Sequence, residues 1–467
     1  MKASSKFAEL AVVAATYSID LIASVAMSLV LPAFVSVDTY AVLRLFLLYV
    51  TFVSVCNLGF NDGVYVKYGA YDYDDLPKDA MHSFLRHVML QGVMFGSLLG
   101  VLGLSGLLGG NGFVCIFLGA NLLILNLNGL YVFINQFTKR FSINLINNGV
   151  SKLVQTALVV GLLIAGVDSA YPFILSITAA NALCLFMNII RNRSILLARP
   201  LLRKVTVPLL KKCYKSGFAI MIGYYASQLI LTSGQFAVSY TCTTEDFAYF
   251  SFAFSVMSFL NVFVNSVSTW LYPTMKRKHV HGSLAGWLGS VSILSGVALS
   301  LLLSAGFLLV TFIPFAIPKY SASIDYLIIL FPTVAYNGVI RMVFGNVYKA
   351  CELERQYMTI NSGAGLVSVI LVFALSYTFP GQTTLIAMAV SLTVVIQYLL
   401  LSCNLREQIS LRTRFSTFLV VSISSLGFEL IAHMNMDHLS MFLTYLAVSV
   451  VLAGICCLLF KKEVNFL

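Results

Sequence analysis

Long apolar blocks separated by short polar segments run through the whole chain. The blocks are about 20 residues long, the length that a helix needs to cross roughly 30 Å of hydrocarbon at 1.5 Å per residue. They lack the one-sided apolar stripe of a helix at the surface of a soluble protein. The pattern predicts fourteen membrane-spanning helices. Their approximate positions are 9–33, 39–60, 84–107, 112–136, 147–166, 171–190, 217–239, 247–271, 287–315, 323–348, 358–378, 382–402, 415–434 and 438–460.

Composition supports this interpretation. Of the 467 residues, 59% are hydrophobic and only 10% are charged, whereas about a quarter of a soluble domain is charged. We therefore expect an all-α polytopic membrane protein. The first block is predicted to be retained, because it contains Asp20 and no small-residue cleavage site follows a short apolar core. Twelve helices are the alternative count, since Glu429 and His433 lie near the outer end of the thirteenth block.

The connections between the blocks alternate in charge. The basic or longer ones are 61–83, 137–146, 191–216, 272–286, 349–357 and 403–414, together with both termini. The other set is short and nearly free of Lys and Arg. We place all but Arg44, Lys319 and Arg341 of the 29 Lys and Arg in or beside the basic set. The positive-inside rule then predicts that both termini are cytoplasmic.

The net charge of +11 is concentrated in the stretch "RNRSILLARPLLRKVTVPLLKKCYKSG" at 191–217. A topology signal and attraction to anionic lipid headgroups explain such a stretch without a nucleic acid. A dedicated protein partner is the alternative. The nine cysteines include no C-x-x-C pair, which argues against a disulfide framework and against a zinc site.

The basic linker divides the chain into two lobes. The predicted parts are a six-helix lobe at 1–190, the cytoplasmic linker at 191–216, a second six-helix lobe at 217–402 and an extra helix pair at 403–467. Each lobe has a similar piece after its first helix, "VDTYAVLRL" in one and "TEDFAYFSF" in the other. The helices before these pieces run in the same direction, so the repeat is parallel. Two parallel lobes around a central cleft are typical of transporters.

Enzyme motifs are absent from the sequence. It contains no H-E-x-x-H, P-loop, G-x-S-x-G or metal-ligand cluster. Every outer connection is also too short for the domain that membrane polymerases and glycosyltransferases generally need. We expect neither catalytic residues nor a metal centre nor a bound cofactor.

Charged residues well inside the predicted helices include Asp20, Arg44 and Arg341. A charge in mid-membrane costs roughly 2.5–3.5 kcal/mol on insertion scales, so each needs a partner or a wet cavity. Asp20 and Arg44 are candidates either for a structural ion pair or for separate roles. The acid in the predicted helix of Arg341 is Asp325, which lies at the opposite end, 16 residues before Arg341, whereas Asn337 precedes Arg341 by one turn. Arginine stays charged, and its planar guanidinium binds phosphate oxygens through two parallel hydrogen bonds, so Arg341 is a candidate anion contact.

Amide side chains recur at helical spacing in both lobes. Such stripes either hold helices together or line a lumen. The residues are Asn121, Asn128 and Asn135 in the fourth helix, Gln228 and Gln235 in the seventh, and Asn261 and Asn265 in the eighth.

The stretch "LGFNDGVYVKYGAYDYDDLP" follows the second helix. It resembles the motif found there in O-antigen and capsule oligosaccharide flippases, the polysaccharide-transporter branch of the multidrug/oligosaccharidyl-lipid/polysaccharide exporter superfamily. "LYPTMKR" at 271–277 and the overall length add to the resemblance. The matching positions are Leu58, Gly59, Phe60, Asp62, Gly63, Tyr68, Gly69, Tyr73, Asp74 and Asp75. We interpret Gly59, Asp62, Gly63, Tyr68 and Gly69 as an elbow or gate at the cytoplasmic mouth, whose glycines allow turns.

The resemblance implies a flippase of the bacterial inner membrane that moves an undecaprenyl-pyrophosphate-linked oligosaccharide by alternating access. Asp20 would be the proton or sodium coupling site, and polysaccharide polymerase and glycosyltransferases would be partners. A cation-coupled multidrug antiporter of the same superfamily and a non-transporting scaffold of a polysaccharide-assembly complex are the alternatives. The residues expected to contact the cargo are Arg44, Arg341, Asn337, Gln228, Asn261, Asn265 and Asn128.

Overall fold

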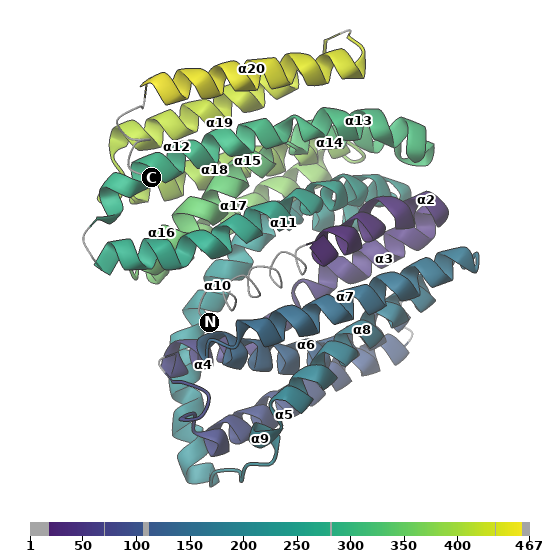
Figure 1. The fold of residues 1–467 in the computed structure, drawn as a ribbon. Coiled ribbons are helices and arrows are strands. Elements are labelled where there is room, and N and C mark those ends of the chain that lie inside the picture. Colours follow the sequence, from purple (N-terminus) through teal and green to yellow (C-terminus); the bar gives the residue numbers. More distant parts are fainter. Residues whose placement is uncertain (1–17, 70, 106–111, 281–282, 435, 460–467) are drawn as a thin grey trace, which may run out of the picture. The chain divides into compact units, whose positions relative to one another are not determined.

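A computed structural model describes residues 18–69, 71–105, 112–280, 283–434 and 436–459 of the chain. All regular structure within these residues is helical, so the predicted all-α class is confirmed. The chain separates into two compact units, Met1–Tyr225 and Ala226–Leu467. Figure 1 shows the helices of both.

The first unit contains the elements up to α9 and the first half of α10. The described chain is helical from Ser18, and the labelled elements follow. They are η1 (Ala26–Val30), α2 (Leu31–Phe34), α3 (Val37–Val50), η2 (Val53–Asn57), α4 (Phe60–Tyr68), α5 (Lys78–Leu104), α6 (Gly112–Phe137), α7 (Phe141–Ile164), α8 (Ala170–Arg191), α9 (Arg193–Leu196) and α10 (Arg203–Thr241). The predicted linker at 191–216 is thus α9 and the first turns of α10, which lie in the first unit.

The second unit contains the end of α10 and all later elements. Two of its predicted helices are interrupted, one by the α12–α13 junction and one by a π-helical turn. The elements are α11 (Thr244–Val280), α12 (Leu284–Leu303), α13 (Ala305–Ala316), η4 (Pro318–Tyr320), α14 (Ser323–Leu330), α15 (Thr333–Val339), η5 (Ile340–Phe344), α16 (Gly345–Ala350), α17 (Glu354–Thr378), α18 (Thr383–Asn404), α19 (Leu411–Ala432) and α20 (His438–Leu459).

Twelve helical segments of the described chain are long and apolar enough to cross a membrane. The protein is therefore a multi-pass membrane protein. Both segments of the last predicted pair, without which the count would be twelve, are among them, as Leu411–Ala432 and Leu439–Cys456. Of the two remaining predicted spans, the one at 217–239 is part of α10. The other, at 9–33, is described only from residue 18, as part of the shorter apolar helix Ser18–Phe34, and its residues 9–17 lie outside the described chain.

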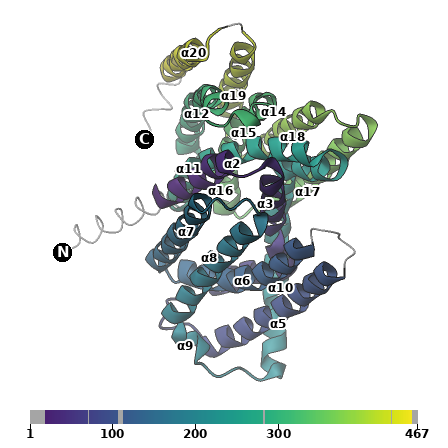
Figure 2. The same cartoon turned by 90° about the vertical axis from the view of Figure 1, so that its right-hand side faces the viewer.

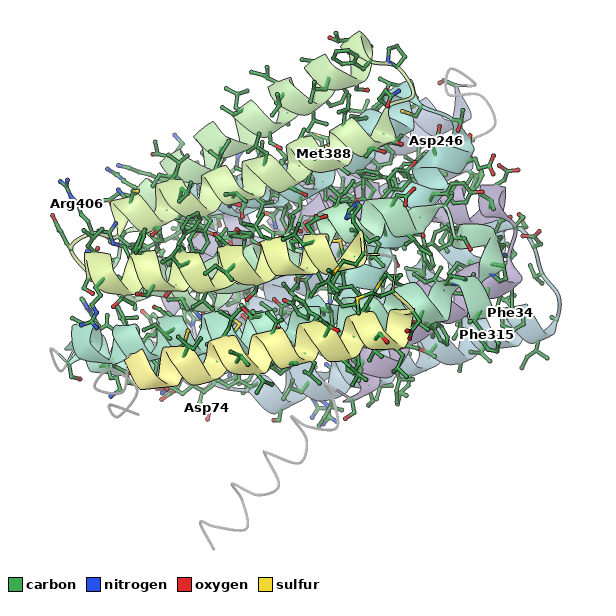
Figure 3. All side chains as sticks on the ribbon, turned by 90° about the horizontal axis from the view of Figure 1, so that it is seen from above. Phe34, Asp74, Asp246, Phe315, Met388 and Arg406 are labelled. Carbon is green, nitrogen blue, oxygen red and sulfur yellow. The ribbon has the colours of Figure 1, made fainter. Side chains whose placement is uncertain are left out.

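Successive connections lie at opposite ends of the helices. In the second unit, Arg406 of a basic connection lies at one end and Asp246 and Phe315 lie at the other (Figure 3). Within the first unit, Asp74 and Phe34 also lie toward opposite ends of the helices. One basic residue departs from the predicted distribution, since Lys152 lies well inside α7 rather than beside a connection.

Glycines allow α5 and α6 to pack closely in the first unit, and Figures 1 and 2 show the two helices side by side. A Cβ atom at Gly96 would lie 2.7 Å from the carbonyl oxygen of Gly119, and one at Gly103 would lie 2.5 Å from that of Gly112. Small residues let helix backbones approach where lipid removes the hydrophobic drive for association. This hairpin is therefore held by backbone contact along its length.

Candidate substrate-binding site

Arg341 lies in a π-helical turn, η5, in the second unit. Single π-turns inside α-helices recur at functional sites, because the extra residue redirects the side chains that follow. The guanidinium donates from Nη2 to Gln228 Oε1 at 3.1 Å and from Nη1 to Asn265 Oδ1 at 3.5 Å. The structure thus brings together three predicted cargo contacts from α10, α11 and η5. Their place in the second unit is consistent with a common site.

The partners of Arg341 are uncharged. Among the described residues, ion pairs within 4 Å join Lys139 to Asp72 and Lys276 to Glu352, and Arg341 forms none. Arg341 is half-buried, and its contacts with Gln228 and Asn265 use only two of the five guanidinium N–H donors. Amide oxygens orient the guanidinium without cancelling its charge. A positioned and uncompensated cation of this kind suits a phosphate or another anion.

The other two predicted contacts in this unit differ in exposure. Asn261 is half-buried on α11, one turn before the exposed Asn265. Asn337 is buried on α15. The π-helical turn begins between Asn337 and Arg341, so their spacing of four residues no longer places them on one face as it would in a regular α-helix. A direct contact of Asn337 with cargo stays a prediction.

In the first unit, Asp20 and Arg44 are both half-buried. The cation whose field acts on the Asp20 carboxylate is Lys152 of α7. Sequence reasoning missed this residue, because Lys152 lies close enough to a basic connection to be grouped with it. An acid and a base at membrane depth reduce the cost of burying each other. The roles of Asp20 in coupling and of Arg44 in anion contact stay predictions.

The asparagines of α6 form a network with α7 and α8. Asn188 donates to Asn128 Oδ1 at 2.7 Å, and its own Oδ1 accepts from Asn147 at 2.9 Å and from Asn135 at 3.2 Å. Asn181 donates to Asn121 Oδ1 at 2.9 Å. These contacts hold three helices together, which was one of the two interpretations of the stripe. Asn128, predicted to bind cargo, is part of this network.

Asn188 is the centre of the network and was not singled out in the sequence. It is fully buried, and Asn181 precedes it by seven residues on α8. The amides of α8 repeat every seven residues, as those of α6 do. This shared repeat is the sequence signal that could have identified α8 as the helix that pairs with the asparagines of α6. Buried amides in lipid are expected to pair in this way, because an unpaired polar group there is costly.

The elbow after the second span is built on one left-handed turn. Leu58 and Gly59 have φ values of +52° and +76°, and helix α4 starts directly afterwards. A side chain at Gly59 would be strained in this backbone conformation. The prediction that Gly59 allows a turn therefore agrees with the structure.

Gly63 and Gly69 differ from Gly59 in backbone conformation. Gly63 lies inside α4, where a Cβ atom would lie 1.8 Å from the carbonyl oxygen of Cys213 on α10. Gly69 lies in the turn that ends α4, with a right-handed φ of −60° that other residues also adopt. The expectation of a glycine turn is thus corrected at Gly63. Gly63 instead permits α4 to cross the backbone of α10.

The polar residues of the elbow are ordered by the same helix. Asp62 lies in the first turn of α4, where an acid interacts favourably with the helix dipole. Tyr68 is buried against Phe84, and burial raises its pKa to about 12, so the hydroxyl stays protonated. The elbow is therefore a packed helix in the first unit. Its role as a gate stays a prediction.

Comparisons with known proteins identify the fold. No family model matches the chain, and no curated protein matches it. A solved structure described as the lipid II flippase MurJ in an inward closed conformation aligns with a TM-score of 0.68 and 14% identity, covering 96% of this chain and 97% of that chain. An inward-facing multidrug resistance MATE family transporter of the MOP superfamily aligns with a TM-score of 0.56 and 11% identity, covering 90% and 96%.

A third structure, a MOP superfamily transporter from Pyrococcus furiosus described as having a binding pocket of reverse polarity, aligns with a TM-score of 0.51 and 12% identity over 90% of this chain and 94% of that one. The chain has the fold of the MOP-superfamily exporters. At these identities the comparisons describe the fold alone.

Proposed function

We propose that the protein is a flippase for a lipid-linked oligosaccharide, with an undecaprenyl-pyrophosphate anchor as the cargo's anionic part. The observation that carries the proposal is the Arg341 guanidinium, which is oriented by Gln228 and Asn265 and has no carboxylate within 4 Å among the described residues. A pyrophosphate would supply the missing negative charge. Lowering the cost of an anion in a low-dielectric path is what a flippase for such a cargo requires.

The two amides that contact Arg341, together with Asn261 one turn away from Asn265 on α11, also suit the sugar part of the cargo. Asn265 is exposed, and Gln228 and Asn261 are half-buried. A ligand can therefore reach these amide side chains, each of which both donates and accepts hydrogen bonds. Hydroxyl groups of a sugar both donate and accept. We infer that Arg341 binds the phosphate and that these amides bind the first sugars. Arg44 would form a second anion contact on the path.

The remaining parts of the proposal concern orientation and coupling. The basic connections favour cytoplasmic termini in a bacterial inner membrane, where glycosyltransferases supply the cargo and a polymerase consumes it. Asp20 would couple transport to a proton or sodium gradient. Movement by alternating access of two lobes fits the fold of the exporters named above.

A cation-coupled multidrug antiporter is the second candidate, because MATE transporters share the fold. Its cargo would be cationic and would be repelled by Arg341. Proteoliposomes separate the two functions. We expect transbilayer movement of a short-chain pyrophosphate-linked oligosaccharide, which is measured as the loss of sugar that an added lectin can bind. We expect no gradient-driven efflux of a cationic dye. Dye efflux without movement of the oligosaccharide would reverse the assignment.

A further inference from the structure

A basic surface with exposed apolar side chains lies between α8 and the first turns of α10 in the first unit. Residues 191–217 contain eight Lys and Arg and no Asp or Glu. Apolar side chains are exposed among these cations, with Leu197 and Leu202 each 79% exposed. We call this surface the basic apolar strip. Its exposed members are Arg193, Leu196, Leu197, Arg199, Leu202, Arg203, Lys204, Val205 and Val207.

The backbone of the basic apolar strip is fixed to the first turns of α5. The amide of Leu201 donates to Ser83 Oγ at 2.8 Å, and that of Arg199 donates to Asp79 Oδ1 at 3.2 Å. Ile195 is fully buried, and its carbonyl oxygen lies 3.1 Å from His82 Nδ1. The polar backbone groups therefore face the protein. The leucines are displayed outward by an anchored segment.

The start of α10 runs across the other helices of the unit. Both views show its first turns crosswise to α5 and α6 (Figures 1 and 2). Its inner face packs closely, since Cys213 is buried where it meets Gly63 and Gly217 meets the backbone of Gly59. A helix that crosses a bundle of spanning helices lies along the membrane plane. Its outer residues are then at the depth of the lipid headgroups.

We propose that the basic apolar strip lies in the headgroup layer and binds anionic phospholipids. Charge complementarity and continuity with the spanning helices α5 and α8 identify the occupant as a lipid surface rather than a soluble protein. Two signals act together on such a surface: apolar side chains that enter the acyl boundary, and cations that attract anionic headgroups. Neither signal involves Arg341, so this inference is independent of the proposed cargo.

Tryptophan quenching in nanodiscs tests the proposal on the full-length protein. The chain has only two tryptophans, so one added indole contributes a large part of the total tryptophan fluorescence. Leu197→Trp and Leu202→Trp are each compared with the parent in nanodiscs of brominated phosphatidylglycerol or brominated phosphatidylcholine. We expect the added fluorescence to be quenched at least threefold more in phosphatidylglycerol, and the difference to shrink at 0.5 M salt. Asp74→Trp is the comparison, because Asp74 is an exposed acid of the same unit outside the basic apolar strip, and its indole should show no preference for phosphatidylglycerol.

Charge removal separates lipid attraction from simple proximity. Arg203→Gln with Lys204→Gln, in the Leu197→Trp protein, should abolish the preference for phosphatidylglycerol. If the Leu197→Trp protein with Arg203 and Lys204 intact is quenched equally in phosphatidylglycerol and phosphatidylcholine, the preference for anionic lipid is wrong. Iodide is a water-soluble quencher, so strong iodide quenching of the indoles at 197 and 202 in phosphatidylglycerol nanodiscs would mean that both positions face water. Such a surface would suit a soluble protein partner, and the proposal would be overturned entirely.

Discussion

The Nη2 atom of Arg341 donates to the side-chain oxygen of Gln228 at 3.1 Å, so an uncharged amide on α10 fixes the direction of a charged group on η5. A carboxylate in the same place would fix it equally well. The amide differs because it leaves the full positive charge available. The function of Arg341 can therefore be examined separately from its position.

Replacing Arg341 tests the proposed phosphate contact. Arg341→Lys keeps the charge and loses the planar fork, whereas Arg341→Ala loses both. We expect partial export for Lys and a loss of at least tenfold for Ala, measured by glycan-display complementation at matched protein levels. Arg355→Ala is the control, since Arg355 is an exposed arginine at the start of α17. Full export by both Arg341 variants would remove the argument for an anionic cargo.

Gln228→Glu tests whether the site depends on an uncompensated charge. The substitution keeps the size of the side chain and places a carboxylate beside Arg341. The carboxylate would form a charge-assisted pair with the guanidinium and compete with the cargo phosphate. We expect a larger loss of export than for Gln228→Ala, with equal amounts of inserted protein. Wild-type export by Gln228→Glu would mean that the guanidinium does not bind an anion.

Gly63→Ala tests the crossing of α4 and α10. The added methyl group has no room beside the carbonyl oxygen of Cys213, so we expect a cost of about 1–3 kcal/mol from overpacking. Gly100→Ala is the matched control in α5, where a Cβ atom meets nothing within 4 Å. Thermal unfolding in detergent should show a lower Tm for Gly63→Ala and an equal or higher Tm for Gly100→Ala. Equal Tm values would show that the crossing relaxes at no cost.

Asn188→Ala tests the helix-joining role of the asparagine network. It leaves Asn128, Asn135 and Asn147 without a shared partner, and a buried polar group left unpaired costs about 1–3 kcal/mol. We expect a lower Tm and near-normal export per folded molecule. Thr156→Ala is the control, because its hydroxyl donates only to a carbonyl of its own helix. A normal Tm with lost export would instead favour cargo contact by this network.

Asp20→Asn tests coupling. The change keeps the shape of the side chain and removes the charge near Lys152. We expect normal insertion, and export that no longer responds to external pH or sodium. The measurement is the export rate across a range of both. The coupling role is wrong if the variant matches the wild-type rate under every condition.

The helical architecture was predictable because block length alone determines which segments span a bilayer. The grouping of Arg341 with Gln228 and Asn265 was partly predictable, since each stood out as polar within an apolar block. The left-handed turn at Leu58 and the π-turn at η5 were not, because both depend on packing that no local pattern records. Lys152 was missed because helix α7 begins at Phe141, earlier than its hydropathy indicates.

The neutral amides around Arg341 also determine how the site responds to dissolved ions. Because the described protein offers this guanidinium no fixed counter-ion within 4 Å, a mobile anion from solution is free to balance its charge. Under the proposed function, arriving cargo would exchange with that anion, so added salt would compete with the cargo directly. Chloride and phosphate on the loading side would then lower the effective affinity of Arg341 for the cargo.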